Sequence, residues 1–260
     1  MTTHISLSRH AAGGPFRQRL TRRLVPLVYP WADVVVGVSK GVSAELESHI
    51  GPGRARVVTV YNPVVTDEGE SAPVATGSAL LPEGCHQMLL SVGRLTRQKN
   101  HALLIDAAAR VFEDSPDTCL VILGEGPERP RLEERIARNG LSGRVLLPGF
   151  DPHPGRYYRR ASVFVLSSDW EGLPTVLIEA LWHGCPVVST RCPSGPEEIL
   201  EGGRLGRLVE PGSVDQLAGA ITAELANPTD AGPLRRRARD FDCRRAVNEY
   251  LALLFPANFG

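Results

Sequence analysis

Six short apolar runs alternate with helical patterns from residue 88 onward, and this alternation limits the fold more than any other feature. Each run is short enough to be a strand that is buried on both faces of a sheet. Strands that alternate with helices pair in parallel through right-handed crossovers, so the helices cover the sheet. The runs are Met88 to Val92, Cys119 to Leu123, Val145 to Leu147, Val163 to Leu166, Val187 to Ser189 and Leu205 to Val209. The sequence therefore predicts an α/β fold with a Rossmann-like parallel sheet and helices on both faces.

Length and composition set the outer bounds of this prediction. A chain of 260 residues with 42% apolar residues can form one large or two modest globular domains. Basic and acidic residues number 29 each, so no net charge points to nucleic acid or to an acidic partner. No stretch approaches the ~20 apolar residues of a membrane span, and no apolar run of signal-peptide length stands at the N-terminus. A cytoplasmic protein is expected.

The cysteines agree with that location. They are odd in number, unclustered and mostly next to apolar segments, which suits buried, reduced thiols and does not suit a zinc site. They are Cys85, Cys119, Cys185, Cys192 and Cys243.

Residues 1–65 contain a separate β-α-β unit in this prediction. Asp33 to Val38 and Arg56 to Tyr61 have the β-branched content of strands. Ser39 is a suitable N-cap for a helix through about Ile50.

Residues 1–31 precede this unit and combine an apolar stripe with several arginines. One interpretation is a surface helix packed on its own domain. The other is a basic amphipathic segment that contacts an anionic membrane surface and makes the protein membrane-peripheral. The arginines are Arg9, Arg17, Arg19, Arg22 and Arg23.

The composition changes after the first unit. Residues 66–86 are rich in Gly, Pro, Ser and Ala, which marks a linker or a surface loop. Residues 87–240 hold the six predicted strands and form the second domain. Residues 241–260 contain a final helix, from about Cys243 to Phe255, with apolar residues at helical spacing.

The stretch from Val163 to Ser189 predicts a strand, a helix and a second strand joined by turns. Glu171 and Glu179 bracket the start of this helix, with seven residues between them. Pro174 suits the first helical position and Gly184 the end. A helix N-terminus after a parallel strand favours anionic ligands, and Glu179 can lean back toward the crevice that Glu171 borders. Alternatively, both residues are ordinary helix formers on a solvated edge.

A second motif follows the first strand of this domain. Gly93 lets the backbone turn at the carboxyl end of the strand, and Arg94 with Lys99 can place two cations beside a diphosphate. Basic residues in a loop are often merely solvated, so this stretch alone leaves function open.

Together the two motifs resemble the E-x7-E and G-R-x4-K signatures of the GT4 (group 1) family of retaining glycosyltransferases, which have the GT-B fold. The similarity runs from about Ala32 to the C-terminus. It implies a donor site in which Arg94 and Lys99 hold and stabilise the departing diphosphate, Glu171 contacts the transferred sugar and Glu179 contacts the ribose. It also implies that residues 87–240 are the nucleotide-sugar-binding domain of GT-B, and that residues 1–65 are a remnant of the acceptor domain, most of which has no counterpart here.

The resemblance extends the site to neighbouring loops. It places the Gly124 to Gly126 turn in the donor cleft and Gly149 with Phe150 against the nucleobase. A tight strand-to-helix turn without ligand contact is an equal alternative for Gly124 and Gly126. The substrate-binding residues that it implies are Gly93, Gly124, Gly126, Gly149, Phe150, Gly172, Leu173, Pro174, Thr175, Val176 and Glu179, beside the catalytic Arg94, Lys99 and Glu171.

No metal ion and no cofactor are expected besides the nucleotide sugar. Asp240-Phe241-Asp242 matches the D-x-D pattern of metal-dependent glycosyltransferases, but no strand precedes it and Asp is an ordinary cap at a helix start. No other group of His, Cys or carboxylate residues has the spacing of a metal site.

The first functional hypothesis is therefore a glycosyltransferase. It would move a hexose or N-acetylhexosamine from a nucleotide sugar, UDP-linked by expectation, to a glycan or lipid-linked acceptor with retention, in polysaccharide or glycoconjugate synthesis. The alternative is a non-catalytic nucleotide-sugar-binding remnant or subunit that requires a partner chain.

Overall fold

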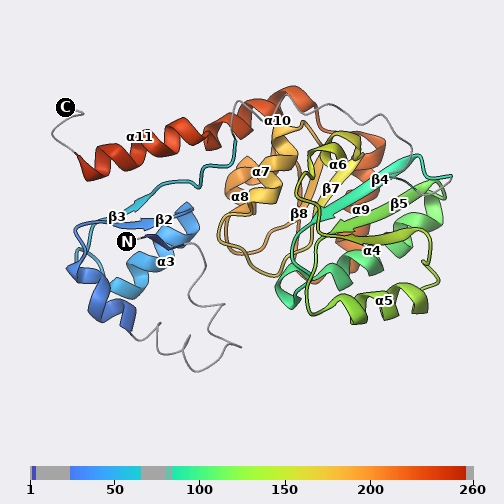
Figure 1. Ribbon diagram of the computed structural model, residues 1–260, viewed down its shortest axis with the longest axis horizontal. Helices are drawn as coiled ribbons and strands as arrows, with labels where there is room; N and C mark the ends of the chain where they lie inside the picture. The colour runs from blue at the N-terminus through green and yellow to red at the C-terminus, as the bar shows by residue number, and fades with distance from the viewer. Residues whose placement is uncertain (1, 4–23, 66–80, 82–83, 256–260) are drawn as a thin grey trace.

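The computed structural model describes residues 2–3, 24–65, 81 and 84–255, and its larger part is a six-stranded parallel sheet (Figure 1). The strand order is β6-β5-β4-β7-β8-β9, and every neighbouring pair is parallel. The strands are β4 (Gln87–Val92), β5 (Thr118–Leu123), β6 (Val145–Gly149), β7 (Val163–Leu166), β8 (Val187–Thr190) and β9 (Arg207–Val209). The predicted fold is confirmed, and each predicted apolar run contributes residues to one strand.

Helices cover both faces of this sheet, because successive strand residues point to opposite faces. In β4, Met88 and Leu90 pack into a core with α6, α7 and α10, whereas Leu89 packs into a second core with α4, α5 and α9. Figure 1 shows α7 and α10 above the sheet and α4 and α5 below it. The helices are α4 (His101–Asp114), α5 (Arg129–Arg138), α6 (Gly155–Arg160), α7 (Thr175–Trp182), α8 (Pro196–Ile199), α9 (Val214–Ala226), α10 (Ala231–Ala238) and α11 (Cys243–Leu254), with 3-10 turns at η4 (Arg97–Lys99), η5 (Glu201–Gly203) and η6 (Arg239–Phe241).

The N-terminal part forms the β-α-β unit that the sequence predicts. Its strands β1 (Thr2–Thr3), β2 (Val35–Gly37) and β3 (Val57–Thr59) form a second parallel sheet, with α3 (Lys40–Ile50) between β2 and β3 and η1 (Tyr29–Trp31) before β2. Ser39 caps α3 by accepting a hydrogen bond from the amide of Val42. The cap was predicted from the residue type alone.

Glu198 of α8 links this unit to the larger sheet domain through hydrogen bonds. Its carboxylate accepts hydrogen bonds from the backbone amide of Lys40 at 3.0 Å and from the hydroxyl of Tyr61 at 2.5 Å. Both donors belong to the N-terminal unit, so one side chain holds the start of α3 and the end of the β3 segment. The side chains of Ser39 and Ser194 add a contact of 3.3 Å beside it.

The predicted final helix is present as α11, which runs from the larger domain toward β2 and β3 (Figure 1). Asp242 caps it by accepting a hydrogen bond from the amide of Arg244, as expected for an aspartate at a helix start. The amide of Cys243 donates to the carbonyl of Val65, which ties the start of α11 to the end of the N-terminal unit.

The prediction of reduced cysteines is wrong for one pair. Cys85 and Cys119 form a disulfide bond, with their Cα atoms 5.8 Å apart. Cys119 lies near the start of β5, and Cys85 lies just before the neighbouring strand β4, so parallel pairing brings together two cysteines that are 34 positions apart. Cys185 and Cys192 are free and buried, as predicted, and burial raises the pKa of each thiol to about 12.

Two predictions fall largely outside the described residues. The basic stretch with Arg9, Arg17, Arg19, Arg22 and Arg23 does so entirely, as does most of the 66–86 linker. Within the part that the structure describes, no helix combines the length and apolarity needed to cross a membrane.

Candidate donor site

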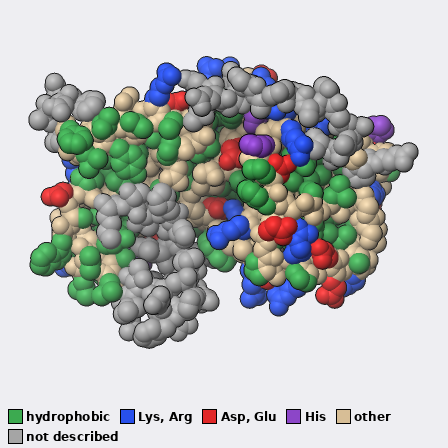
Figure 2. All heavy atoms as spheres, viewed as in Figure 1, with side chains coloured by type: hydrophobic (Ala, Val, Ile, Leu, Met, Phe, Trp, Pro, Cys, Tyr) green, Lys and Arg blue, Asp and Glu red, His purple; other side chains and the backbone are tan. Residues whose placement is uncertain are grey.

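The two sequence motifs meet where the strand order reverses. The chain runs from β4 outward through β5 and β6, and then returns to form β7 on the other side of β4. The connections after β4 and β7 therefore lead to helices on opposite faces, α4 and α7, and leave a crevice at the carboxyl ends of these strands. In Figure 2 the side of the molecule that faces the viewer is hollowed near its middle, with acidic and basic side chains at the edge of the hollow.

Hydrogen bonds join the segment 97–100 to the segment 167–171. The Asp169 amide donates to the Gln98 carbonyl at 2.8 Å, and the Gln98 side-chain amide donates to the Trp170 carbonyl at 2.8 Å. Two further bonds run from Ser167 Oγ to the Lys99 carbonyl and from Asn100 Nδ2 to Asp169 Oδ1, both at 2.9 Å. The loops that carry the two motifs are therefore one connected structure.

Lys99 and Glu171 form an ion pair inside this structure. Lys99 Nζ lies 2.7 Å from Glu171 Oε1, and the two side chains are 16% and 7% exposed. Ser168 donates to the same oxygen at 2.6 Å. The backbone of Glu171 bonds to the loop at Pro193 and Ser194, which fixes the residue from its other side. The buried carboxylate is thus compensated by a cation and a hydroxyl.

A cavity of about 600 Å³ is lined by both Arg94 and Glu179. Gly93 also lines it, and the Lys99 side chain packs against Gly93, since a Cβ atom there would stand 3.3 Å from Lys99 Cε. Arg94 is exposed and its side chain has no hydrogen-bond or ion-pair partner among the described residues, so its guanidinium is available to an anion. Glu179 is half-buried, and desolvation raises its pKa above the ordinary value although a hydrogen bond from Tyr158 acts in the opposite direction. The cavity is lined by Val92, Gly93, Arg94, Leu123, Gly124, Glu125, Phe150, Asp151, Pro152, Pro154, Val176 and Glu179.

The start of α7 supplies two free amides. Pro174 is the N-cap and α7 begins at Thr175, one residue later than predicted. The amide of Leu177 donates to the Pro174 carbonyl, whereas those of Thr175 and Val176 have no partner in the described part of the chain. The positive end of the helix dipole adds to these donors. Val176 also lines the cavity, so an anion there can reach this helix end.

The glycines of the 124–126 turn have a packing role. A Cβ atom at Gly124 would stand 2.0 Å from the carbonyl oxygen of Gly93, and one at Gly126 would stand 2.4 Å from that of Leu95. The two loops can pack closely only because these residues lack side chains. Gly124 lines the cavity as well, and Gly126 does not, so both interpretations of the turn apply to Gly124.

The structure divides the predicted site residues into two groups. Six line the cavity, namely Gly93, Arg94, Gly124, Phe150, Val176 and Glu179. Of the others, two lie in the hydrogen-bonded segments and four lead into the start of α7, while Gly126 lies in the turn after β5 and Gly149 ends β6. The residues outside the cavity lining are Lys99, Gly126, Gly149, Glu171, Gly172, Leu173, Pro174 and Thr175.

Sequence reasoning missed the residues that hold the two carboxylates. Ser168 bonds to Glu171, and Tyr158 bonds to Glu179 from a different helix. Ser168 could have been noticed because it lies three residues before Glu171 at a strand end, whereas no sequence signal connects Tyr158 with a residue 21 positions away.

The D-x-D match does not form a metal site in the structure. Asp242 caps α11, and Asp240 pairs with Arg237 and Arg245. Among the described residues, no three His, Cys, Asp or Glu side chains are grouped so that they could hold a metal ion.

A parallel sheet with a crevice at its strand-order reversal, where Arg94, carboxylates and a helix N-terminus lie, has the architecture of a GT-B domain. The chain belongs to the family of glycosyl transferases group 1, whose family model matches residues 81–241.

Two curated relatives and one solved structure illustrate the similarity. An N-acetylgalactosaminyltransferase from Campylobacter jejuni that is named for a diphospho-undecaprenol-linked substrate is 36% identical over 195 residues, which are 75% of this chain and 51% of that protein. The lipopolysaccharide core biosynthesis glycosyltransferase LpsE from Rhizobium meliloti is 33% identical over 172 residues, 64% of this chain and 49% of that protein. The chain spans about half the length of these relatives. The structure of HepE from Anabaena in complex with UDP and glucose has 22% identity and a TM-score of 0.81, covering 97% of this chain and 71% of that one.

Proposed function

We propose that this protein is a retaining glycosyltransferase of the GT4 type that transfers a hexose or N-acetylhexosamine from a UDP-linked donor. The acceptor is a glycan or a lipid-linked saccharide in polysaccharide or glycoconjugate synthesis. The observation that carries the proposal is the Lys99–Glu171 pair, which joins the two motifs at 2.7 Å beside the cavity that holds Arg94 and Glu179.

Each group has a chemical task in this proposal. In it, Arg94 and the amides at the start of α7 bind the diphosphate, and Lys99 shares its contact between Glu171 and the β-phosphate. These positive groups stabilise the negative charge that develops on the diphosphate as the bond to the sugar breaks. Glu171 orients the sugar through its hydroxyl groups, and Glu179 accepts from the ribose.

The donor site does not use a metal ion in this proposal. Two cationic side chains and a helix N-terminus can neutralise a diphosphate without one. The named relative from Campylobacter supports the acceptor class, and the solved HepE complex supports UDP as the donor nucleotide.

We also propose that the protein is cytoplasmic and that its N-terminal unit, on the acceptor side, contacts the membrane surface. Leu27 and Trp31 are 66% and 90% exposed, and exposed tryptophan is typical of a membrane interface. Sedimentation with anionic phospholipid vesicles tests this part. Trp31→Ala should lower the fraction of protein that sediments with the vesicles. The control Phe150→Ala, at an exposed aromatic residue in the cavity, should not lower it.

Titration calorimetry with UDP, GDP and ADP tests the donor site directly. We expect UDP to bind and to bind more tightly than the other two, and a folded protein that binds none of them would overturn the proposal. Transfer is tested separately with a radiolabelled UDP-N-acetylhexosamine and a polyprenyl-diphosphate-linked saccharide, and the anomeric configuration of the product tests retention. Tight UDP binding without transfer would favour the non-catalytic alternative.

A further inference from the structure

A buried hydrogen bond links the donor cavity to α6. Tyr158 is 1% exposed, and its hydroxyl donates to Glu179 Oε2 over 3.0 Å. The hydroxyl is the donor because an ionised carboxylate can only accept. No other side chain bonds to the Glu179 carboxylate within the described residues, so Oε1 is left without a protein partner in a side chain that lines the cavity.

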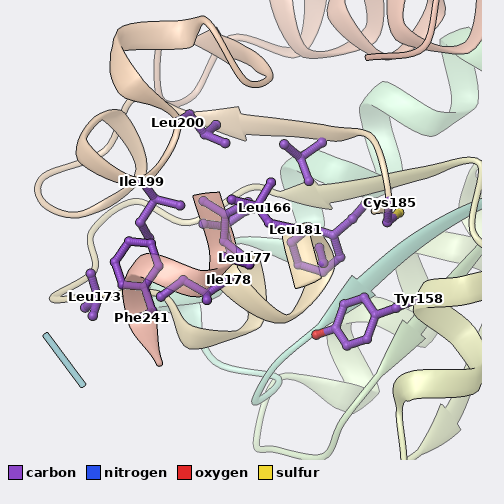
Figure 3. Packing of buried hydrophobic residues seen from close by; sticks show 14 of the residues in the cluster. Tyr158, Leu166, Leu173, Leu177, Ile178, Leu181, Cys185, Ile199, Leu200 and Phe241 are labelled. Atoms are coloured by element: carbon purple, nitrogen blue, oxygen red, sulfur yellow. The ribbon is translucent and has the colours of Figure 1, made fainter. Parts of the chain in front are cut away.

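The ring of Tyr158 is held on two sides. It stacks on His183, with ring centroids 5.6 Å apart and planes 16° apart, and it lies 5.5 Å from the ring of Phe164 in β7. Figure 3 shows Tyr158 with its hydroxyl directed away from Cys185. A ring fixed in this way presents its hydroxyl at one place, and a bond to it removes rotamer freedom from the flexible glutamate.

We propose that Tyr158 is a positioning residue that holds the Glu179 carboxylate so that Oε1 accepts hydrogen bonds from the ribose hydroxyls of a nucleoside diphosphate. This inference rests on the proposed donor site. It adds the element that orders the ribose contact and predicts discrimination between nucleotides with and without those hydroxyls.

The type of residue at position 179 argues against a purely structural bond. A buried tyrosine hydroxyl needs only some acceptor, and a glutamine or a backbone carbonyl would satisfy it without burying charge. Burial raises the pKa of Glu179, so the fold retains a carboxylate where desolvation disfavours the ionised form. Such a group in a cavity is typical of a binding site.

The location fits a ribose between two other parts of the ligand. Arg94 and the start of α7 face the same cavity and suit the diphosphate, while Phe150, Pro152 and Pro154 supply apolar surface for a base. The free carboxylate oxygen of Glu179 belongs to the same cavity, and a carboxylate suits a pair of adjacent hydroxyl groups.

Calorimetry of five proteins with UDP and 2′,3′-dideoxy-UDP tests the inference. The proteins are the wild type, Tyr158→Phe, Glu179→Gln, the double variant Tyr158→Phe/Glu179→Gln and the control Tyr157→Phe. Tyr158→Phe keeps the ring and its stacking, and Tyr157→Phe makes the same change at a neighbouring buried residue that does not line the cavity. Circular dichroism and thermal unfolding establish that each variant is folded.

We expect the wild type to prefer UDP to its dideoxy analogue. Tyr158→Phe should weaken UDP roughly 5- to 10-fold, the loss for one hydrogen bond, and leave the dideoxy analogue within about twofold. Tyr157→Phe should leave both ligands unchanged. On a Glu179→Gln background, Tyr158→Phe should have no further effect on UDP.

The possible failures are distinguishable. If the wild type binds neither ligand, the donor site itself is wrong. If Glu179→Gln abolishes the preference for UDP but Tyr158→Phe retains it, the donor site stands and the role of Tyr158 is overturned. An equal loss of both ligands in Tyr158→Phe would also overturn it, because a general loosening of the cavity would then explain the effect.

Discussion

Replacing Lys99 with methionine should destabilise the fold, although the residue lies in a loop. The change keeps most of the apolar stem and removes the ammonium group that lies 2.7 Å from Glu171 Oε1. At an effective dielectric constant of about 20, two unit charges at that distance attract by about 6 kcal/mol, which the desolvation of both groups largely offsets. Removing one partner forfeits the attraction and leaves the desolvated carboxylate, which is 7% exposed.

The loss from breaking such a pair is about 3–5 kcal/mol. Ser168 still donates to the same carboxylate oxygen, so we expect a value near the lower end, about 3 kcal/mol. Adding Glu171→Gln to Lys99→Met should recover most of this loss, because a neutral amide then replaces the uncompensated charge.

Urea unfolding followed by circular dichroism measures these free energies. Arg138→Met is the matched control, because it breaks an exposed ion pair: Arg138 is 64% exposed and its partner Glu134 is 69% exposed. The loss at such a pair should stay below about 1 kcal/mol. A Lys99→Met protein within about 0.5 kcal/mol of the wild type would refute the reasoning, as would a double variant no more stable than the single one.

The remaining predictions concern the proposed donor site and the disulfide bond. Arg94→Ala should weaken both UDP and UDP-sugar by roughly 1.5–3 kcal/mol in calorimetry, whereas Glu171→Gln should weaken the UDP-sugar and spare UDP; equal losses for both ligands at Glu171 would place that residue on the nucleotide. Chelation by EDTA should leave UDP affinity unchanged, and a strict requirement for a divalent ion would contradict the proposal that the site uses no metal. Glu179→Gln should stabilise the fold at neutral pH while weakening UDP binding. Because burial raises the pKa of Glu179, the wild type loses stability relative to the variant as pH rises through that pKa. The thermal unfolding midpoints of the two proteins should converge at acid pH, and midpoints that stay apart there would contradict this. Reduction of Cys85–Cys119, which closes a loop of 34 positions, should lower the unfolding free energy by at most about 4 kcal/mol in the chain-entropy model, and a Cys85→Ala/Cys119→Ala protein should not respond to reductant.

The parts of the fold that depend on local pattern could be predicted from the sequence. The apolar runs give all six strands of the larger sheet because a strand buried on both faces requires apolar residues regardless of its neighbours. Ser39 and Asp242 mark helix starts through their own side-chain chemistry. The meeting of the two motifs also follows, since both lie at the carboxyl ends of parallel strands.

The parts that depend on distant contacts could not be predicted in the same way. The sequence presents Lys99 and Glu171 as separate binding groups, and only the adjacency of β4 and β7 shows that they neutralise each other. The Cys85–Cys119 bond likewise depends on the register of β4 against β5. Tyr158 lies among arginines in a helix without any motif, so its bond to Glu179 requires the packed structure.

Because hydrogen bonds join segments 97–100 and 167–171, the two segments must be exchanged together, although their ion-paired residues are 72 positions apart. A chimera of two members of this family with its junction between β5 and β7 would combine segment 97–100, which carries Lys99, from one parent with segment 167–171, which carries Glu171, from the other. The side chains that bond across the two segments would then come from different proteins and need not fit each other. Recombination aimed at a new sugar specificity should therefore take both segments from one parent and place its junctions before β4 and after β8.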